Sequence, residues 1–244
     1  MPHDLADPIG QQTLEHLALA ARFNRWMFET VAAHWQPGSV FEVGSGIGNL
    51  SQHVLDSGRK AVLSDLRSSY CDHLRARFGG HPHLLGVAAL DLVDPAFAQR
   101  AQAHLGRYDN LYALNVIEHI ADDRLALHHA AQLLRPGGRM VILVPAYPRL
   151  YNRFDHELGH HRRYTEAQLR AAFLAAGLRV QEAFAFNAMG IPGWWLSGSV
   201  LRKQVIPAWQ LRVYDRLVPA FRQVDRLLGR RVGLSVVMVG EKPA

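Results

Sequence analysis

The sequence contains a single cysteine, Cys71, and lacks long apolar runs. One cysteine excludes an internal disulfide framework, and a chain of 244 residues can bury a core that needs no such staple. No basic segment followed by an apolar stretch opens the chain, and no uninterrupted apolar run reaches the ~18 residues of a membrane-spanning helix. We therefore expect a cytoplasmic globular protein rather than a secreted or membrane-spanning one.

Lysine is also scarce, because only three of the 27 basic residues are lysine, and the formal net charge is +6. An excess of arginine beside abundant alanine and leucine is typical of a GC-rich bacterial genome. A basic balance permits nucleic acid, anionic lipid or an acidic substrate as a partner. It selects none of them, so the function has to be inferred from motifs.

The most informative motif is a glycine-rich turn between a strand and a helix. Residues 40–43 have strand character, Gly44, Gly46 and Gly48 follow, and an apolar-periodic stretch continues to about Leu55. Glycine permits positive φ and lets the backbone approach a ligand closely. The helix that follows offers free N–H groups and a positive dipole end, so we predict a ligand with a carboxylate or a phosphate at this turn.

The spacing of the glycines distinguishes between two classes of nucleotide-binding protein. The dinucleotide fingerprint would place its third glycine at position 49, which is Asn49 here, and this disfavours a nicotinamide-dependent oxidoreductase. The last glycine instead follows two residues after the second, and an acid, Glu42, precedes the turn. This pattern resembles motif I of the class I S-adenosylmethionine (SAM) dependent methyltransferases.

Two further acids follow predicted strands. Asp65 ends the predicted strand 60–65, about 20 residues beyond the glycine turn, where an acid accepts hydrogen bonds from ribose hydroxyls. Asp91 follows the predicted strand 84–90, at the position that resembles the adenine-binding acid of the same family. Each acid has an alternative role as a helix N-cap; for Asp65 this would be the helix predicted over 68–78.

The resemblance becomes specific in the second half of the predicted sheet. Residues 108–120 contain a strand followed by Asn-Val-Ile-Glu-His-Ile, and residues 133–142 read Leu-Leu-Arg-Pro-Gly-Gly-Arg-Met-Val-Ile. These segments resemble motif IV and the following motif of small-molecule methyltransferases related to the ubiquinone-biosynthesis group. Pro136-Gly137-Gly138 also suits a helix stop and a tight turn before the fifth strand. With the glycine turn and the two acids, the likeness covers residues 38–144.

The resemblance implies SAM as cofactor and S-adenosylhomocysteine as product. It also implies an α/β fold with a Rossmann-like, seven-stranded, mostly parallel sheet, helices on both faces, and an antiparallel last pair of strands (178–187 and 234–240). The residues expected to bind the cofactor, including one aromatic from a predicted N-terminal lid, are Glu42, Gly44, Ser45, Gly46, Gly48, Asn49, Asp65, Leu66, Asp91, Leu92, Asn115, Val116 and Trp26.

We expect one methyltransferase domain over residues 1–244. Its parts are N-terminal lid helices (1–36), a Rossmann-like core (38–187), a helical cap (188–232) and the last strand (233–241). Within the first part, residues 1–13 are polar and expected to be a loose start, and helical periodicity runs from Leu14 to Trp35.

The cap contains two predicted helices. One opens at Gly193 and is apolar, and the other spans 211–228, contains Pro219 and has a polar face. The polar residues of that face are Arg212, Asp215, Arg216, Arg222, Asp225 and Arg226. The cap either packs on the sheet edge as an ordinary amphipathic element, or lies on an anionic membrane or a lipid-linked substrate.

The loop after the fifth strand, residues 145–164, is the best predicted place for chemistry, because ligands gather at the carboxyl ends of the strands. A base assists removal of the nucleophile's proton, and histidine titrates near neutral pH. The candidate catalytic residues are His160, His161, His119 and His156. The candidate substrate-binding residues are Tyr147, Arg162, Arg163, Tyr164, Trp194 and Trp195. For each histidine alone, a solvated loop position remains the alternative.

Glu118-His119 with His156 or His160 also suggests a metal site. Metal-dependent relatives that methylate RNA ends or catechol-like phenols have Glu-x-x-Glu-His at this position. Asn115 stands in place of the first Glu, so we expect no metal.

The leading hypothesis is a transferase that methylates an O or N atom, less readily a C atom, of a small apolar, aromatic or lipid-linked molecule, with peripheral membrane contact through the cap. Nucleic-acid methylation is the first alternative; it is disfavoured because residues 115–118 lack the Asn/Asp-Pro-Pro-aromatic motif and Cys71 lies in a predicted helix. A non-catalytic SAM-binding partner protein is the second. The sequence specifies neither the substrate nor the oligomeric state.

Overall fold

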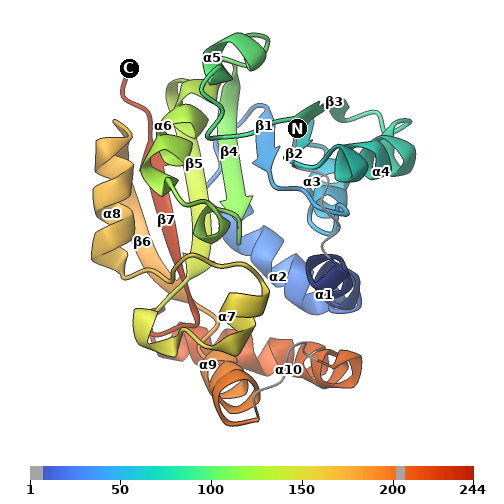
Figure 1. Cartoon of the computed structure of the whole chain (residues 1–244), viewed down its shortest axis with the longest axis vertical. Coiled ribbons are helices and arrows are strands. Elements are labelled where there is room, and N and C mark those ends of the chain that lie inside the picture. Colours follow the sequence, from blue (N-terminus) through green and yellow to red (C-terminus); the bar gives the residue numbers. More distant parts are fainter. Residues whose placement is uncertain (1–7, 202–206) are drawn as a thin grey trace.

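A computed structural model describes residues 8–201 and 207–244, and a single seven-stranded sheet forms its centre (Figure 1). The strand order is β3-β2-β1-β4-β5-β7-β6. The strands are β1 (Val40–Val43), β2 (Ala61–Asp65), β3 (Leu84–Ala89), β4 (Tyr108–Leu114), β5 (Leu134–Pro145), β6 (Arg179–Phe186) and β7 (Ser235–Glu241). Neighbours from β3 to β5 are parallel, whereas β7 is antiparallel to β5 and β6. The predicted fold class is therefore confirmed.

Helices cover both faces of this sheet (Figure 1). They are α1 (Pro8–Ala18), α2 (Ala21–Ala32), α3 (Ser51–Asp56), α4 (Ser68–Phe78), α5 (Phe97–Arg100), α6 (Asp123–Leu133), α7 (Arg153–Glu157), α8 (Glu166–Ala175), α9 (Gly190–Trp194) and α10 (Ala208–Leu227). One core lies between the sheet and α5, α6 and α8, and a second lies between the sheet and α2, α3, α4 and α10. The central strands are buried on both faces, which explains their nearly continuous apolar sequences.

The N-terminal segment is more ordered than its composition predicts. Helix α1 begins at Pro8, so the expectation of a loose start through residue 13 is wrong from that residue on, while residues 1–7 lie outside the described part. Proline is tolerated in the first turn of a helix because its missing N–H would be unpaired there anyway. Helix α2 ends at Ala32, three residues before the predicted end at Trp35.

The glycine pair before the fifth strand differs from the prediction. The predicted turn at 136–138 lies inside β5 rather than before it. The register shifts between the pair Tyr108↔Leu134 and the pair Asn110↔Arg139, so the extra residues form an irregularity on β5. Gly137 takes a positive φ of 75° there.

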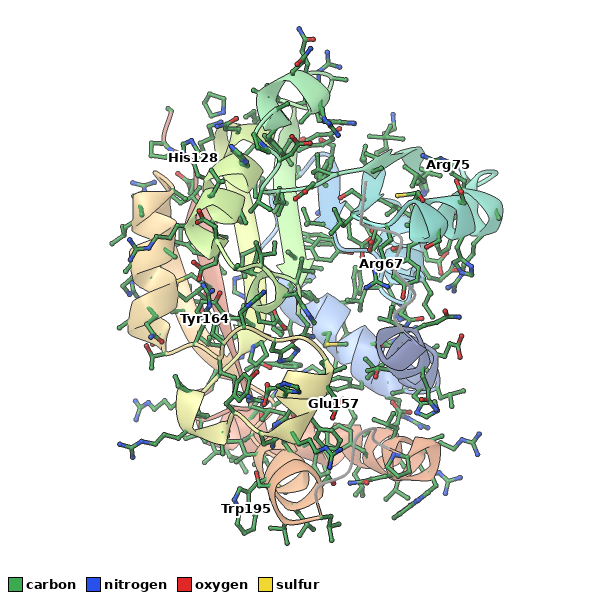
Figure 2. The ribbon with its side chains drawn as sticks, in the orientation of Figure 1. Arg67, Arg75, His128, Glu157, Tyr164 and Trp195 are labelled. Carbon is green, nitrogen blue, oxygen red and sulfur yellow. The ribbon has the colours of Figure 1, made fainter. Side chains whose placement is uncertain are left out.

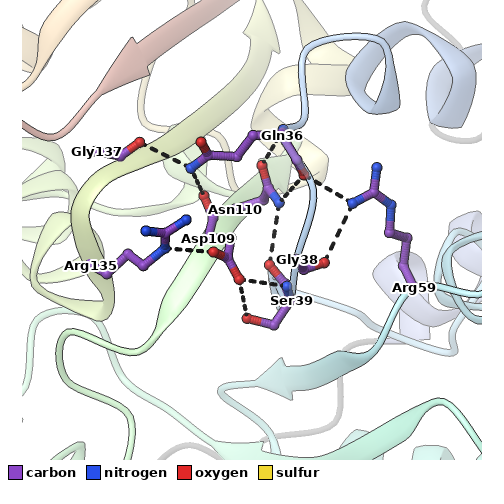
Figure 3. Close-up of polar contacts among 8 residues, drawn as sticks. All are labelled: Gln36, Gly38, Ser39, Arg59, Asp109, Asn110, Arg135 and Gly137. Atoms are coloured by element: carbon purple, nitrogen blue, oxygen red, sulfur yellow. Dashed lines mark hydrogen bonds and ion pairs between the residues drawn. The ribbon is translucent and has the colours of Figure 1, made fainter.

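A polar network fixes the sheet at the end opposite the glycine turn (Figure 3). One carboxylate oxygen of Asp109 accepts hydrogen bonds from the backbone N–H of Ser39 (2.7 Å) and from its hydroxyl (3.0 Å). The Gln36 side chain donates to the backbone oxygens of Asp109 and Gly137, both at 2.9 Å. These bonds tie the segment before β1 to β4 and β5, so the carboxyl ends of the same strands are held side by side.

The cap comprises α9, a π-helical turn η3 (Trp195–Val200) and α10. Its first helix begins at Gly190 rather than at the predicted Gly193, and Pro219 lies inside α10. Among residues 8–201 and 207–244, we find no helix whose length and apolar character would let it cross a bilayer.

The predicted polar face of α10 needs a correction, because two of its acids are buried. Asp215 accepts from the backbone N–H of Phe23 (2.9 Å) in the first turn of α2, whose N-cap side chain makes no such bond. Asp225 accepts from the N–H groups of Asn187 (2.7 Å) and Ala188 (2.9 Å) after β6. Burial of a carboxylate is tolerated when backbone donors surround it, so these acids anchor the cap.

Candidate active site

The glycine turn has the left-handed backbone that its glycines allow. Gly44, Gly46 and Gly48 have φ values of 72°, 53° and 82°. A Cβ atom at Gly44 would lie 2.3 Å from Cγ2 of Val116, and one at Gly48 would lie 2.4 Å from Cε2 of Phe78. Both the conformation and the close packing therefore require glycine at these positions.

Hydrogen bonds of Glu42 and of three serines fix the turn. Glu42 is 2% exposed, and its carboxylate accepts from the hydroxyl of Ser51 at 2.6 Å. The Ser45 N–H donates to the backbone oxygen of Ser64 (2.8 Å), and the Ser45 hydroxyl accepts from the Ser64 N–H (3.2 Å). Burial raises the pKa of Glu42 to about 7, against the opposing hydrogen bond from Ser51. Glu42 is thus enclosed within the fold, and its contact with a ligand stays a prediction.

Asp65 joins the end of β2 to the glycine turn. Its carboxylate accepts from the N–H of Gly46 (2.9 Å) and from the N–H of Arg67 (3.0 Å). The N-cap residue of α4 is Arg67, so Asp65 is not the N-cap of this helix. At the end of β3, Asp91 accepts from the N–H of Val93 (2.9 Å) and so stabilises a local turn. Asp65 therefore bonds the glycine turn, whereas Asp91 follows the end of β3, two strands away from β1 in the sheet.

The remaining predicted cofactor residues differ in environment. Leu66 is exposed, whereas Leu92 is buried and its backbone oxygen lies 2.8 Å from Nδ1 of His129. Asn115 is exposed at the end of β4, has a φ of 53°, and donates its N–H to the Leu143 oxygen. Asparagine is among the few residues that tolerate this left-handed backbone.

Helix α1 lies against the glycine turn. The Asn49 side chain donates to the backbone oxygen of Leu14 (2.9 Å), and a Cβ atom at Gly46 would meet the Leu14 side chain at 3.0 Å. Beside this contact is a cavity of about 480 Å³. The cavity is lined by Ala18, Ala21, Asn24, Ile47, Asn49, Gln52, His53, His73 and Arg77.

Trp26 lies elsewhere than predicted. Its side chain is buried in the core, with ring centroids 4.5 Å from Phe186 and 6.2 Å from Phe23. The expected contact of Trp26 with the cofactor has no support from these neighbours, which are core side chains of α2 and the end of β6. Its amphipathic helix buries the ring against the sheet instead.

On the other side of the site, Glu118 lies in a 3₁₀ turn, η1 (Ile117–His119), that follows β4. Its side chain is 0% exposed, and in the part of the chain that the structure describes neither carboxylate oxygen has a hydrogen-bond partner. Burial raises the pKa of Glu118 to about 8, although its own N–H and the Arg163 guanidinium oppose this. A buried polar group without a partner is rare and points to a ligand or a proton.

His160 faces this carboxylate. Its Nε2 lies 4.0 Å from Oε1 of Glu118, and its ring centroid lies 4.7 Å from that of His119 at 86°. The other ring nitrogen, Nδ1, lies 2.8 Å from Oδ1 of Asp155. Although burial acts in the opposite direction, hydrogen bonds from His160 and Arg163 hold the pKa of Asp155 below its usual value.

Local capping explains how the loop presents His160. Helix α7 opens with a capping box in which Asn152 accepts from the Phe154 N–H and Asp155 accepts from the Asn152 N–H. The phenol of Tyr151 donates to the His160 backbone oxygen at 2.7 Å. The N–H of the next residue, 161, donates to the backbone oxygen of residue 118 at 2.8 Å, which joins the loop to η1.

Three predicted substrate residues have internal partners. Arg162 pairs with Asp123 (2.8 Å) and donates to the Ala121 oxygen (2.6 Å), and Tyr164 is buried and donates to Asp123 (2.8 Å). Arg163 is also buried, where it donates to Asp155 and to the oxygen of residue 146. We correct the expectation for Arg163 and Tyr164, because their polar atoms hold the loop in place rather than face a ligand.

The other candidates lie at the surface or beside the loop. His156 and His161 are exposed and outside the Glu118 cluster, and Tyr147 is exposed with a φ of 58°. The Trp194 ring packs 5.2 Å from Phe154 and 4.6 Å from the Arg163 guanidinium. Trp195 is 52% exposed, and Figure 2 shows it pointing away from the sheet at the far end of the cap.

Sequence reasoning missed the role of Asp155, and it considered Glu118 only as a ligand of a metal that it did not expect. The Asn-x-x-Asp pattern at 152–155 was a usable signal for a capping box. The burial of Glu118 has no comparable signal, because neighbours such as His160 and Arg163 come from a loop distant in the sequence.

Comparison with known proteins agrees with the fold and the glycine turn. The family described as "Methyltransferase domain" matches residues 15–183. The polyketide synthase component of lovastatin nonaketide synthase from Aspergillus terreus is 27% identical over 151 residues, which are 58% of this chain and 5% of that protein. Polyketide synthase ThaG from Burkholderia thailandensis is 28% identical over 145 residues, 54% of this chain and 2% of that protein.

The chain therefore spans at most about a twentieth of the length of these relatives. Among solved structures, a chain of the complex between the Haloferax volcanii Trm112 methyltransferase activator and its methyltransferase has a TM-score of 0.65 at 18% identity, covering 99% of this chain and 100% of that one. The [4+2]-cyclase SpnF has a TM-score of 0.60 at 13% identity, covering 91% and 81%. At these identities the structural likeness concerns the fold.

Proposed function

The chain belongs to the class I SAM-dependent methyltransferase family, and from this we propose that it transfers the methyl group of SAM to an O or N atom of a small molecule. SAM is its methyl donor. The acceptor is an apolar, aromatic or lipid-linked compound. A closer relation to the ubiquinone-biosynthesis group stays a prediction.

The cofactor half of the site is built from strand ends. We assign the methionine and ribose parts to the turn Gly44–Gly48 and to Asp65, and the adenine to Asp91 and the Leu92 backbone. The support is that Asp65 bonds the Gly46 N–H and that Asp91 lies at the end of the neighbouring strand. A carboxylate oxygen that accepts one backbone N–H retains a lone pair for a ribose hydroxyl.

The observation that carries the acceptor half is the buried Glu118 carboxylate beside His160. Both lie at the carboxyl end of the sheet, just beyond Asn115. Methyl transfer is an in-line displacement, so the enzyme has to align the nucleophile with the sulfonium methyl and exclude water. We place the acceptor at this cluster, where the nucleophile loses its proton; the C–S bond breaks and its electron pair passes to sulfur.

We further propose that the whole chain is one catalytic domain in which residues 1–36 close over the cofactor and 188–232 handle the acceptor. Contacts of Leu14 with the glycine turn support the first part. For the second, the cap carries a set of apolar side chains exposed to solvent, which suit an apolar acceptor or peripheral contact with a membrane. They are Trp195, Leu196, Val200, Leu201, Trp209 and Val213.

A label-tracing experiment tests the proposed function. Purified protein is incubated with methyl-labelled SAM and a cell lysate, and the lipid extract, small molecules and macromolecules are separated. We expect label among small molecules or lipids. Label only in nucleic acid or protein would contradict the proposal, and tight SAM binding without any transfer would favour a non-catalytic SAM-binding protein.

Carbon methylation is the second candidate. It is favoured by relatives that are polyketide synthases and by a structural neighbour, the CurJ carbon methyltransferase, with a TM-score of 0.55 at 16% identity, covering 86% of this chain and 50% of that one. The chemical shift of a ¹³C-labelled methyl group in the isolated product separates the three acceptor atoms, because O-, N- and C-bound methyl carbons resonate at different fields.

A further inference from the structure

We propose that Glu118, His119 and His160 bind a divalent transition-metal ion. The role of this metal in methyl transfer rests on the proposed function, whereas the binding of the metal does not. Two imidazoles and one carboxylate are a ligand set that suits zinc or iron, and three protein ligands leave a coordination position for the acceptor.

The three side chains already converge. Each offers one ligand atom, and these atoms all lie within 4.8 Å of one another. Nε2 of His160 is 4.0 Å from Oε1 of Glu118. Metal bonds of ~2.0–2.2 Å place tetrahedral ligand atoms roughly 3.3 Å apart, so side-chain movements of less than about 1 Å close the site.

Asp155 fixes the tautomer that a metal site needs. Its carboxylate accepts from Arg163 at 2.8 and 2.9 Å, and it lies 2.8 Å from Nδ1 of His160. An ionised Asp155 accepts the Nδ1 hydrogen, which leaves the lone pair of Nε2 directed at Glu118. A metal-binding histidine almost always donates its other ring N–H to a carboxylate, a backbone carbonyl or a water, which fixes the orientation of the ring.

The buried carboxylate of Glu118 is an independent reason to infer a metal ion. Within residues 8–201 and 207–244, both oxygens of Glu118 are buried and have no hydrogen-bond donor from another residue, and Nε2 of His160 is an acceptor when Nδ1 donates to Asp155. An ionised carboxylate and a ring lone pair that face each other without a donor are unfavourable. A cation between them satisfies both groups, and the exposed His119 leaves the site accessible from the acceptor side.

The metal has a clear role in the transfer. A hydroxyl that coordinates a divalent cation loses its proton to solvent more readily, because the cation lowers its pKa. The oxygen then attacks the methyl carbon as the C–S bond breaks, and the products are the methylated acceptor, S-adenosylhomocysteine and one proton. The absence of an acid at Asn115 does not prevent this, because His160 contributes from the loop after β5.

Metal titration of the purified chain tests the site. The protein is freed of metal with a chelator and titrated with Zn²⁺ by calorimetry, and with Co²⁺ followed by its visible absorption. We expect one equivalent bound, with affinity at least about tenfold weaker in Glu118→Gln and His160→Ala. Asp155→Asn, a change at a positioning residue, should weaken binding about 10- to 100-fold.

Matched controls keep the test decisive. His128→Ala removes an exposed histidine on α6, which Figure 2 shows on the opposite end of the molecule from the cap, and should leave Zn²⁺ affinity unchanged. Calorimetry with SAM shows whether each variant is folded. Binding that persists in both Glu118→Gln and His160→Ala, or no binding to the wild type, overturns the inference.

The same measurements distinguish a failure of the metal site from a failure of the proposed function. Methyl transfer that is unaffected by the chelator, together with no Co²⁺ spectrum, contradicts the metal and leaves the methyltransferase intact. A Co²⁺ spectrum that depends on Glu118, without transfer to any small molecule or lipid, supports the metal site and contradicts the proposed function.

Discussion

Glu42 and Glu118 are both buried near the carboxyl ends of the adjacent strands β1 and β4, and burial raises the pKa of each, to about 7 and about 8. Their surroundings differ. Glu42 accepts a hydrogen bond from Ser51 beneath the glycine turn, whereas Glu118, within the residues described, has no such donor. Burial costs free energy in both cases. Glu42 recovers part of it through the Ser51 hydrogen bond, whereas Glu118 is compensated, in the described part of the chain, only by its own N–H and by the charge of Arg163.

The difference separates two functions of buried charge. On the β1 side, Glu42 bonds Ser51 at the start of α3 and Asp65 bonds the Gly46 N–H, so the two acids shape the place proposed for the cofactor. On the β4 side, Asp155 and Arg163 position His160, while Glu118 is left with open acceptors. An open buried carboxylate at the carboxyl end of a strand is available to a ligand or a proton.

The largest expected effect comes from removing the open carboxylate. Glu118→Gln should lower kcat/KM by about 10²–10³, because the variant loses the carboxyl group that would bind a cation or exchange a proton at the acceptor site. The melting temperature should change little, since the glutamine amide has the same size and is as buried and as poorly hydrogen-bonded as the carboxyl group it replaces. Steady-state kinetics and thermal unfolding on the same samples measure both; a clear fall in stability would mean that Glu118 is a structural residue like Glu42.

A pH series tests the partnered glutamate. The pKa of Glu42 is raised from 4.5 to about 7 on folding, so the folded state holds a proton that the unfolded state releases. Stability should therefore fall by about 3 kcal/mol as the pH rises from 4.5 to 7, and this contribution should level off above pH 7. Denaturant unfolding in the Glu118→Gln background isolates this contribution.

The control for that series is the double variant that also carries Glu42→Gln. Its stability should vary less over the same range, since glutamine still accepts from Ser51 but does not titrate. Equal slopes in the single and double variants would show that Glu42 does not carry the pH dependence.

Asp65 gives a smaller effect, on the cofactor side only. Asp65→Asn keeps the shape of the side chain but replaces one of its two carboxylate oxygens with an NH₂ group. These two oxygens accept from the Gly46 and Arg67 N–H groups. We expect SAM affinity to fall about tenfold, which is about 1.4 kcal/mol, with zinc affinity unchanged. Calorimetry with both ligands checks this, and a parallel loss of zinc binding would show that the two halves of the site are coupled.

Sequence reasoning succeeded where local chemistry determines structure. Strand periodicity and glycine spacing predicted the sheet, the positive φ angles at Gly44, Gly46 and Gly48, and the acid Asp65 beside them, because each depends on a few neighbouring residues. It failed at Asp215, assigned to an exposed face, since that acid caps a helix almost 200 residues earlier. Periodicity along one helix cannot reveal such a partner.

The same limit applies to the candidate site. The histidines near 160 were recognised by residue type and by their place after a strand. Which of them faces Glu118 depends on the capping box of α7 and on the bond from residue 161 to residue 118, and neither follows from spacing. Arg163 looked like an anion anchor for the same reason, although its partner is Asp155.

The smallest effect is expected at Asn115, between the cofactor half and the acceptor half of the site. Its left-handed φ of 53° favours glycine, so Asn115→Gly should change the free energy of unfolding by less than about 1 kcal/mol, whereas Asn115→Ala should lower it by about 1 kcal/mol. Both remove the amide, and if it contacts the methionine part of SAM, as the family resemblance implies, both should weaken SAM binding equally, by a few fold. Unfolding and calorimetry on the pair separate backbone strain from ligand contact. Weaker SAM binding in the alanine variant alone would show that position 115 acts through its backbone, and that the carboxyl end of β4 serves the cofactor by its shape.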